Sequence, residues 1–96
     1  MLVLITYDVS TVSKGGQKRL RKVSKACQNY GQRVQNSVFE CVLDSTQFET
    51  LKFELMSIID ENQDSLRFYR LGNNYKSKVV HLGVKESLDI ESPLII

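Results

Sequence analysis

The chain has 96 residues, with 13 Lys and Arg against 11 Asp and Glu, one His, two Cys, one Pro and no Trp. A domain typically has about 100–150 residues, so this length allows one hydrophobic core and excludes two. Apolar residues make up 42% and charged residues 25%, ordinary values that exclude a disordered or collagen-like chain. Two cysteines are too few for a disulfide framework, and no Cys/His spacing is typical of a metal site. Because Met1–Ile5 is too short for a signal or membrane segment, we expect a soluble cytoplasmic protein with reduced thiols and no membrane contact.

The first half of the chain predicts a strand, a helix and more strand. Leu2–Tyr7 is apolar and β-branched and ends at Asp8, which is typical of a buried central strand. After a loop with two glycines, apolar residues recur at helical spacing: Leu20, Val23, Ala26, Cys27 and Tyr30. Gly31 follows the last of them and can end the helix in the left-handed conformation. Residues 33–43 favour strand, either one strand bent at Asn36-Ser37 or two antiparallel strands joined there.

The second half predicts another helix and then strand again. A capping-box pattern, Thr46-x-x-Glu49, predicts the start of a helix, with Ser45 as the alternative cap. Its apolar residues are Phe48, Leu51, Leu55, Met56 and Ile59. Leu66–Leu71 predicts the next strand and Val79–Val84 a further one, after which the composition is loop-like until the apolar end Pro93–Ile96.

This order of elements predicts the fold class α+β. Two right-handed crossovers that place both helices on one face give a ferredoxin-like βαββαβ antiparallel sheet, here with an extra C-terminal strand. We assign residues 1–84 to this domain and residues 85–96 to a C-terminal extension. The open face or edge of such a sheet is a natural surface for a homodimer.

Charge is distributed unevenly along the chain. Residues 14–33 include seven basic side chains and no acidic one: Lys14, Lys18, Arg19, Arg21, Lys22, Lys25 and Arg33. Residues 40–64 include seven acidic side chains and a single Lys52, and residues 67–78 are basic again. A basic helix attracts polyanions, and contacts with phosphates make such binding weaken as salt rises. The alternative is a solvated face that keeps the protein soluble.

Asp8 is the strongest candidate for chemistry. Cys27 and Cys41 lie in apolar patterns typical of core residues, and His81 has no visible partner. Asp8, in contrast, stands where a hydrophobic strand ends, just before a polar loop and the basic helix. A carboxylate there can hold a hard cation such as Mg²⁺ or Mn²⁺, and two copies related by a two-fold axis make a better site than one. The alternative is a turn residue that caps its own backbone.

Several segments of the chain resemble the CRISPR-associated Cas-two family. They are Tyr-Asp-Val-Ser at 7–10, Arg-Leu-Arg-Lys-Val at 19–23 and Tyr-Gly-Gln-Arg-Val-Gln-Asn-Ser-Val-Phe-Glu at 30–40. Residues 64–69 and 93–96 resemble the later segments of the family, and the whole is similar to the variant of type I-C systems. The resemblance implies a ferredoxin-like homodimer that acts in spacer acquisition, in antiviral defence, together with the CRISPR integrase Cas-one. It also implies a Mg²⁺-dependent endonuclease, a hydrolase that acts on double-stranded DNA or single-stranded RNA.

The resemblance further implies roles for single residues. Asp8 matches the catalytic, metal-binding acid and meets its two-fold mate at the dimer interface. Family positions together with the basic helix give a nucleic-acid-binding set: Tyr7, Lys18, Arg19, Arg21, Lys22, Lys25, Arg33 and Phe39. Leu94, Ile95 and Ile96 match a C-terminal strand that crosses to the partner's sheet; the alternative is a tail packed on its own subunit.

Two functions stay open on these grounds. The first is a divalent-metal nuclease that depends on Asp8. The second is a non-catalytic scaffold, in which basic side chains hold DNA by its backbone while the dimer bridges two integrase dimers. One chain can do both. A third interpretation, an RNA-binding domain of similar topology, is weaker because the Lys/Arg-Gly-Phe strand motif with paired aromatics is missing.

Overall fold

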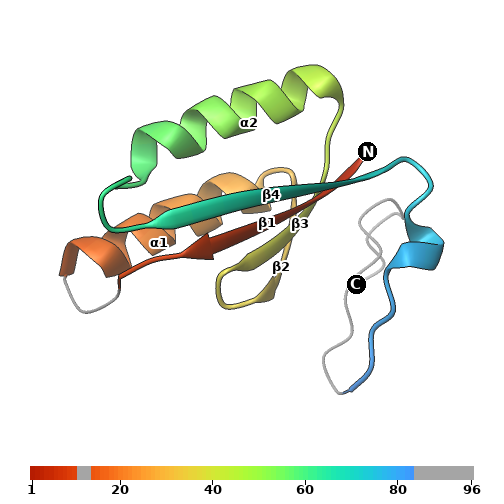
Figure 1. Ribbon diagram of the computed structural model, residues 1–96, viewed down its shortest axis with the longest axis horizontal. Helices are drawn as coiled ribbons and strands as arrows, with labels where there is room; N and C mark the ends of the chain where they lie inside the picture. The colour runs from red at the N-terminus through yellow and green to blue at the C-terminus, as the bar shows by residue number, and fades with distance from the viewer. Residues whose placement is uncertain (11–13, 84–96) are drawn as a thin grey trace.

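The computed structural model describes residues 1–10 and 14–83 (Figure 1). The elements in chain order are β1 (Leu2–Asp8), α1 (Lys14–Gln28), β2 (Gly31–Gln35), β3 (Val38–Val42), α2 (Ser45–Ile58), β4 (Ser65–Gly72) and the short 3₁₀ helix η1 (Lys76–Lys78). The order predicted from the apolar pattern is confirmed from β1 to β4. Asn36 and Ser37 form the turn between two separate strands, which settles the alternative left open by the sequence.

The four strands form one antiparallel sheet in the order β2-β3-β1-β4. Both helices lie on the same face of this sheet (Figure 1). The central strand β1 pairs with β3 up to Thr6 opposite Val38, and with β4 up to Asp8 opposite Ser65. This is the predicted ferredoxin-like βαββαβ arrangement, and the face of the sheet opposite the helices carries no helix of the described residues.

Alternation along β1 decides which side chains enter the core. Val3, Ile5 and Tyr7 are 0%, 0% and 1% exposed and pack under the helices. Their partners in the core come from every layer of the domain: Val23, Cys27, Phe39, Cys41, Leu51 and Leu55. Successive side chains of a strand point to opposite faces, so Asp8, the neighbour of Tyr7, lies on the open face and is exposed. Tyr7 and Asp8 therefore belong to different environments.

The predicted cap of α2 is wrong by two residues. Asp44 is the N-cap: its Oδ1 accepts a hydrogen bond from the Gln47 backbone N–H at 2.7 Å, and Gln47 Oε1 accepts one from the Asp44 N–H at 3.0 Å. Both Ser45 and Thr46 already lie inside the helix. A carboxylate paired with Gln forms the same reciprocal bonds as the Thr and Glu pattern read from the sequence.

Gly31 has a different role from the predicted helix end. It opens β2 and has no positive φ; among the described residues Gly72 and Gly83 adopt that conformation instead. A Cβ atom at position 31 would lie 1.9 Å from the Glu40 carbonyl oxygen. The glycine is therefore required by the close approach of β2 to β3.

The chain after β4 differs from the predicted extra strand. Within the described residues, 79–83 form no strand, and Val80 and Leu82 are 79% and 87% exposed. Residue 84 and the extension 85–96, with Leu94, Ile95 and Ile96, lie outside the described residues. None of the described helices combines the length and the apolar composition needed to cross a bilayer.

Candidate functional site

The buried carboxylate of Asp64 connects three segments of the chain close to the end of β1, where Asp8 lies. Asp64 precedes β4, and its side chain is 0% exposed. It accepts hydrogen bonds from the Tyr7 hydroxyl at 2.5 Å, from Arg19 Nε and Nη2 at 2.7 and 3.1 Å, and from the Asp60 backbone N–H at 3.0 Å. The two bonds from Arg19 form the bidentate arrangement that suits a guanidinium and a carboxylate. Asp64 thus connects β1, α1 and the turn that leads into β4.

This cluster shifts the ionisation of all three side chains. Burial raises the pKa of Asp64, but the hydrogen bonds from Arg19, Tyr7 and the Asp60 N–H outweigh it and hold the pKa well below the usual range. Burial and the bond to Asp64 raise the pKa of Tyr7 from 10.0 to about 12. The bond to Asp64 likewise raises the pKa of Arg19. Tyr7 stays neutral and Arg19 and Asp64 stay charged at neutral pH.

Three of the predicted nucleic-acid-binding residues have side chains that are buried or paired within the domain, and their proposed role stays a prediction. Tyr7 and Phe39 are 1% and 0% exposed, so neither ring can meet a base in this conformation. The Arg19 side chain is only 17% exposed, and its charge is compensated by Asp64. Strand alternation places Tyr7 and Phe39 in the core, and the partner of Arg19 is 45 positions away in the sequence. The three side chains hold the fold together near the site.

Asp8 lies in a shallow hollow on the open face of the sheet. The hollow has a volume of about 370 Å³ and is lined by Thr6, Tyr7, Asp8, Ser37, Val38, Ser65 and Arg67. Asp8 makes no ion pair or side-chain hydrogen bond with any other part of the chain that the structure describes. The alternative interpretation, a turn residue that caps its own backbone, finds no support in these contacts. Arg67 adds a cation, with its Nη1 donating to the Tyr69 hydroxyl at 2.9 Å.

The donor set around Asp8 fits a shared metal ion better than one held by a single chain. Across residues 1–10 and 14–83, no cluster of three or more His, Cys, Asp or Glu side chains can hold a metal ion. One exposed carboxylate with nearby hydroxyls supplies hard oxygen donors of the kind that Mg²⁺ prefers, but too few of them to enclose an ion. A second copy of the carboxylate would be needed.

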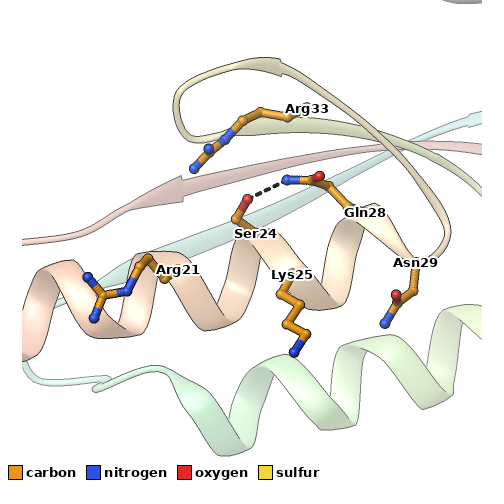
Figure 2. A pocket seen from close by; sticks show the side chains of 6 residues that line it. All are labelled: Arg21, Ser24, Lys25, Gln28, Asn29 and Arg33. Carbon is orange, nitrogen blue, oxygen red and sulfur yellow. Dashed lines mark hydrogen bonds between the residues drawn. The ribbon is translucent and has the colours of Figure 1, made fainter.

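The remaining predicted basic residues lie on the surface. Lys18, Arg21, Lys22 and Lys25 of α1 are exposed, and so is Arg33 of β2. The structure brings Arg21, Lys25 and Arg33 together around a second hollow, on the helix side of the sheet (Figure 2). Asp8 and these cations are therefore on opposite sides of the sheet and do not form one site within a single chain.

Asp64 is the functional-region residue that sequence reasoning missed. Its charge was counted within the acidic run of residues 40–64, and nothing there marked it as different from its exposed neighbours. One signal was available: Asp64 directly precedes a strand, and Asp8 is the last residue of another. Because neighbouring antiparallel strands place the end of one beside the start of the next, both acids fall at the same end of the sheet.

Fold and side chains together define a small ferredoxin-like domain with an exposed carboxylate on its open face and cations around its first helix. The chain belongs to the family CRISPR associated protein Cas2, whose model matches residues 1–79. It is 75% identical over 95 residues to the CRISPR-associated endonuclease Cas2 of Halalkalibacterium halodurans, with 99% of each chain covered. It is 58% identical over 96 residues to the CRISPR-associated endoribonuclease Cas2 of Nitratidesulfovibrio vulgaris, covering 100% of this chain and 94% of the relative.

Solved structures agree with this assignment. The crystal structure of Streptococcus pyogenes Cas2 at pH 6.5 superposes with a TM-score of 0.80 at 55% identity, covering 86% of this chain and 100% of the other. A hypothetical protein of Thermus thermophilus gives a TM-score of 0.70 at 35% identity, covering 86% and 90%. The family resemblance read from the sequence is confirmed, while the likeness to type I-C systems stays a prediction.

Proposed function

We propose that this chain is a metal-dependent endonuclease that cleaves phosphodiester bonds of DNA or RNA during spacer acquisition in prokaryotic antiviral defence. The observation that carries the proposal is Asp8, an exposed carboxylate in a hollow beside Arg67, without a protein partner among the described residues. The names of two relatives support it, since one is called an endonuclease and the other an endoribonuclease. Two reduced, buried cysteines suit a cytoplasmic setting.

The proposed cofactor is Mg²⁺, or Mn²⁺ in its place, shared by Asp8 of two copies in a homodimer. Such an ion supplies Lewis-acid stabilisation of the negative charge that develops on a phosphodiester oxygen. The homodimer itself is supported by the sheet face that carries no described helix and by the exposed Val80 and Leu82. A domain of about 100 residues also buries a limited share of its surface alone, which makes a partner subunit favourable.

Replacement of Asp8 tests the proposal directly. Asp8→Asn keeps the size of the side chain and breaks no described contact, so the fold should be unchanged. Loss of the metal-binding carboxylate should lower the rate of cleavage of a labelled duplex or single strand at least about a hundredfold. Glu40→Gln is the matched control, because this carboxylate also lies on the open face, on β3.

Added chelator should reproduce the effect of Asp8→Asn in the wild-type protein. Full cleavage by Asp8→Asn, or cleavage that persists in chelator, would contradict the proposal. Comparing double-stranded DNA with single-stranded RNA in the same assay identifies the preferred substrate.

A second function, a DNA-binding scaffold that bridges dimers of the Cas-one integrase, is favoured by the exposed cations of α1. It predicts that the double charge reversal Arg21→Glu and Lys22→Glu abolishes DNA binding and integration, whereas Asp8→Asn leaves both intact. Arg19 is omitted from this test because its reversal would place a second acid against buried Asp64. An integration assay with the purified integrase separates the two functions.

A further inference from the structure

Two side chains of opposite charge line the hollow on the open face of the sheet without forming an ion pair. They are Asp8 of β1 and Arg67 of β4, and the volume of the hollow is about 370 Å³. The two ion pairs within residues 1–10 and 14–83 include neither of them. Arg67 also lies on the opposite side of the sheet from the cations of α1. The acid and the cation of this hollow are therefore both available to a ligand.

The register of β1 against β4 places the two charges near each other. Asp8 lies opposite Ser65, and Thr6 lies opposite Arg67, so Asp8 and Arg67 are diagonal neighbours. Diagonal neighbours on one face of an antiparallel pair lie about 7–8 Å apart, a distance that a long Arg side chain can cross. The spacing of the strands therefore does not prevent an ion pair, and a further contact decides where the guanidinium lies.

Tyr69 provides this contact. Arg67 Nη1 donates a hydrogen bond to the Tyr69 hydroxyl at 2.9 Å, and the guanidinium carbon lies 5.8 Å from the centroid of the Tyr69 ring. Tyr69 pairs with Leu4, which is two positions further from Asp8 than Thr6 is. The guanidinium is therefore held on the side of the hollow away from Asp8. Its other N–H donors remain available to a ligand, and a fixed donor loses little entropy on binding.

We infer that the Arg67 guanidinium binds the two non-bridging oxygens of a phosphodiester group that lies beside Asp8. A planar guanidinium presents paired N–H donors that match two such oxygens. Arg67 is the only cation in the described lining, where Thr6, Ser37 and Ser65 add hydroxyl groups. The inference rests on the proposed function, since it takes a phosphodiester as the ligand. It makes Arg67 a catalytic residue, which stabilises the negative charge of the substrate while it reacts.

Binding of a minimal phosphodiester tests the contact without any cleavage. Dimethyl phosphate is titrated in chelator into the protein labelled with a nitrogen isotope, and the Nε–Hε resonance of each arginine is followed by NMR. The Arg67 resonance should shift and saturate. The resonance of Arg70, which lies on the same strand but over the Phe48 ring, should shift less and without saturation. Asp8→Asn should lower the dissociation constant measured at Arg67 about threefold, because a negative charge beside the anion is removed.

A cleavage assay measures what the contact contributes to the reaction. Arg67→Gln should lower kcat about a hundredfold, the effect of losing a donor that faces the charge developing on the substrate. Arg67→Lys keeps the charge but not the paired donors, so it should recover less than about tenfold of this loss. Arg70→Gln is the matched control, because it removes the same charge from β4 outside the hollow and should leave kcat and KM unchanged.

The alternative role for Arg67 is a contact between the two copies of the dimer. Sedimentation should therefore show the same dimer dissociation constant, within about threefold, for the wild type, Arg67→Gln and Arg70→Gln. Dissociation of the dimer by Arg67→Gln alone would assign the residue to the interface and overturn the inference. An Arg67 resonance that behaves as that of Arg70 does, or equal losses of kcat in the two variants, would also overturn it.

These results are distinguishable from the test of the nuclease proposal. Full cleavage by Asp8→Asn contradicts that proposal, whereas the response of the Arg67 resonance to dimethyl phosphate still decides whether the phosphodiester contact exists. Loss of cleavage in Asp8→Asn, together with full cleavage by Arg67→Gln, overturns the inference and leaves the nuclease proposal standing.

Discussion

Asp64 shows how a single buried charge can organise the surroundings of another residue. It accepts four hydrogen bonds, one of them from the Tyr7 hydroxyl. This bond holds the Tyr7 side chain in the core, and the next residue, Asp8, points to the opposite face of β1. Removing one partner of a buried ion pair is costly because the other charge is left without compensation. The position of Asp8 therefore depends on a network whose central carboxylate is fully buried.

At this scale we predict that Asp64→Asn lowers the free energy of unfolding at pH 7 by about 3 kcal/mol, since Arg19 loses its counter-charge. Urea unfolding followed by circular dichroism measures the difference. Glu61→Gln, which removes an exposed carboxylate from the same turn, should leave the midpoint nearly unchanged. Equal effects of the two substitutions would show that the network is not stabilising.

The pH dependence of stability follows from the same shifts. The pKa of Asp64 is lower in the folded state, so its contribution is present above about pH 4 and is lost as the pH falls further. The difference in the free energy of unfolding between the wild type and Asp64→Asn should therefore become smaller below pH 4. The pKa of Tyr7 is raised from 10.0 to about 12, so its contribution is lost as the pH rises through that interval. Tyr7→Phe should flatten this alkaline decline.

Residue roles were the least predictable part of the site. Asp8 could be singled out because a lone acid at the end of an apolar strand is visible in the sequence. The burial of Arg19 could not be predicted, because amphipathic spacing shows only which residues share a face of one helix. The partner of Arg19, Asp64, comes after α2 in the sequence. Phe39 matched a family position, but only the register of β3 against β1 shows that its ring enters the core. Long-range pairing determined these roles.

Among the elements, α2 provides a test of cap assignment. Asp44→Ala should destabilise the protein by about 1 kcal/mol, because the N-terminal turn loses the hydrogen bond that the Gln47 N–H donates to the Asp44 carboxylate. Thr46→Ala should be neutral, since this residue lies inside the helix and alanine favours helix more than threonine does. Thermal unfolding of the two variants measures the loss of stability in each. A larger loss for Thr46→Ala than for Asp44→Ala would contradict the observed cap.

The elements themselves were largely predictable because each follows from a local pattern. The apolar run of β1 and the periodicity of α1 and α2 predicted elements that the structure contains, whereas the sequence left open whether Asn36-Ser37 is a bend or a turn. Ends of elements depend on finer contacts: Gly31 looked like a helix end, yet it is required by the close approach of the Glu40 carbonyl. The predicted strand beyond Val79 is not formed within the described residues, where no neighbouring strand pairs with it.

For the whole molecule, the exposed segment after η1 predicts how two copies associate. Val80 and Leu82 are 79% and 87% exposed, and exposed apolar side chains of this kind favour burial against a partner. The double variant Val80→Ser and Leu82→Ser should raise the dissociation constant of the dimer at least about tenfold. Analytical ultracentrifugation measures the change.

The control for this prediction is Phe53→Ser, which removes a 76% exposed ring from α2. This variant should dimerise as the wild type does. If Phe53→Ser is monomeric while the Val80→Ser and Leu82→Ser double variant still dimerises, the interface lies on the helix side of the molecule instead.

The sheet keeps the Asp8 hollow and the second hollow, around Arg21, Lys25 and Arg33, on separate sides of one thin domain. Under the proposed function, a short oligonucleotide would occupy either region but could not bridge them. A longer one that passes around an edge of the sheet would engage both, and its second contact would form at the high effective concentration set by the first. The proposed function therefore predicts that avidity appears only above a threshold length of the nucleic acid.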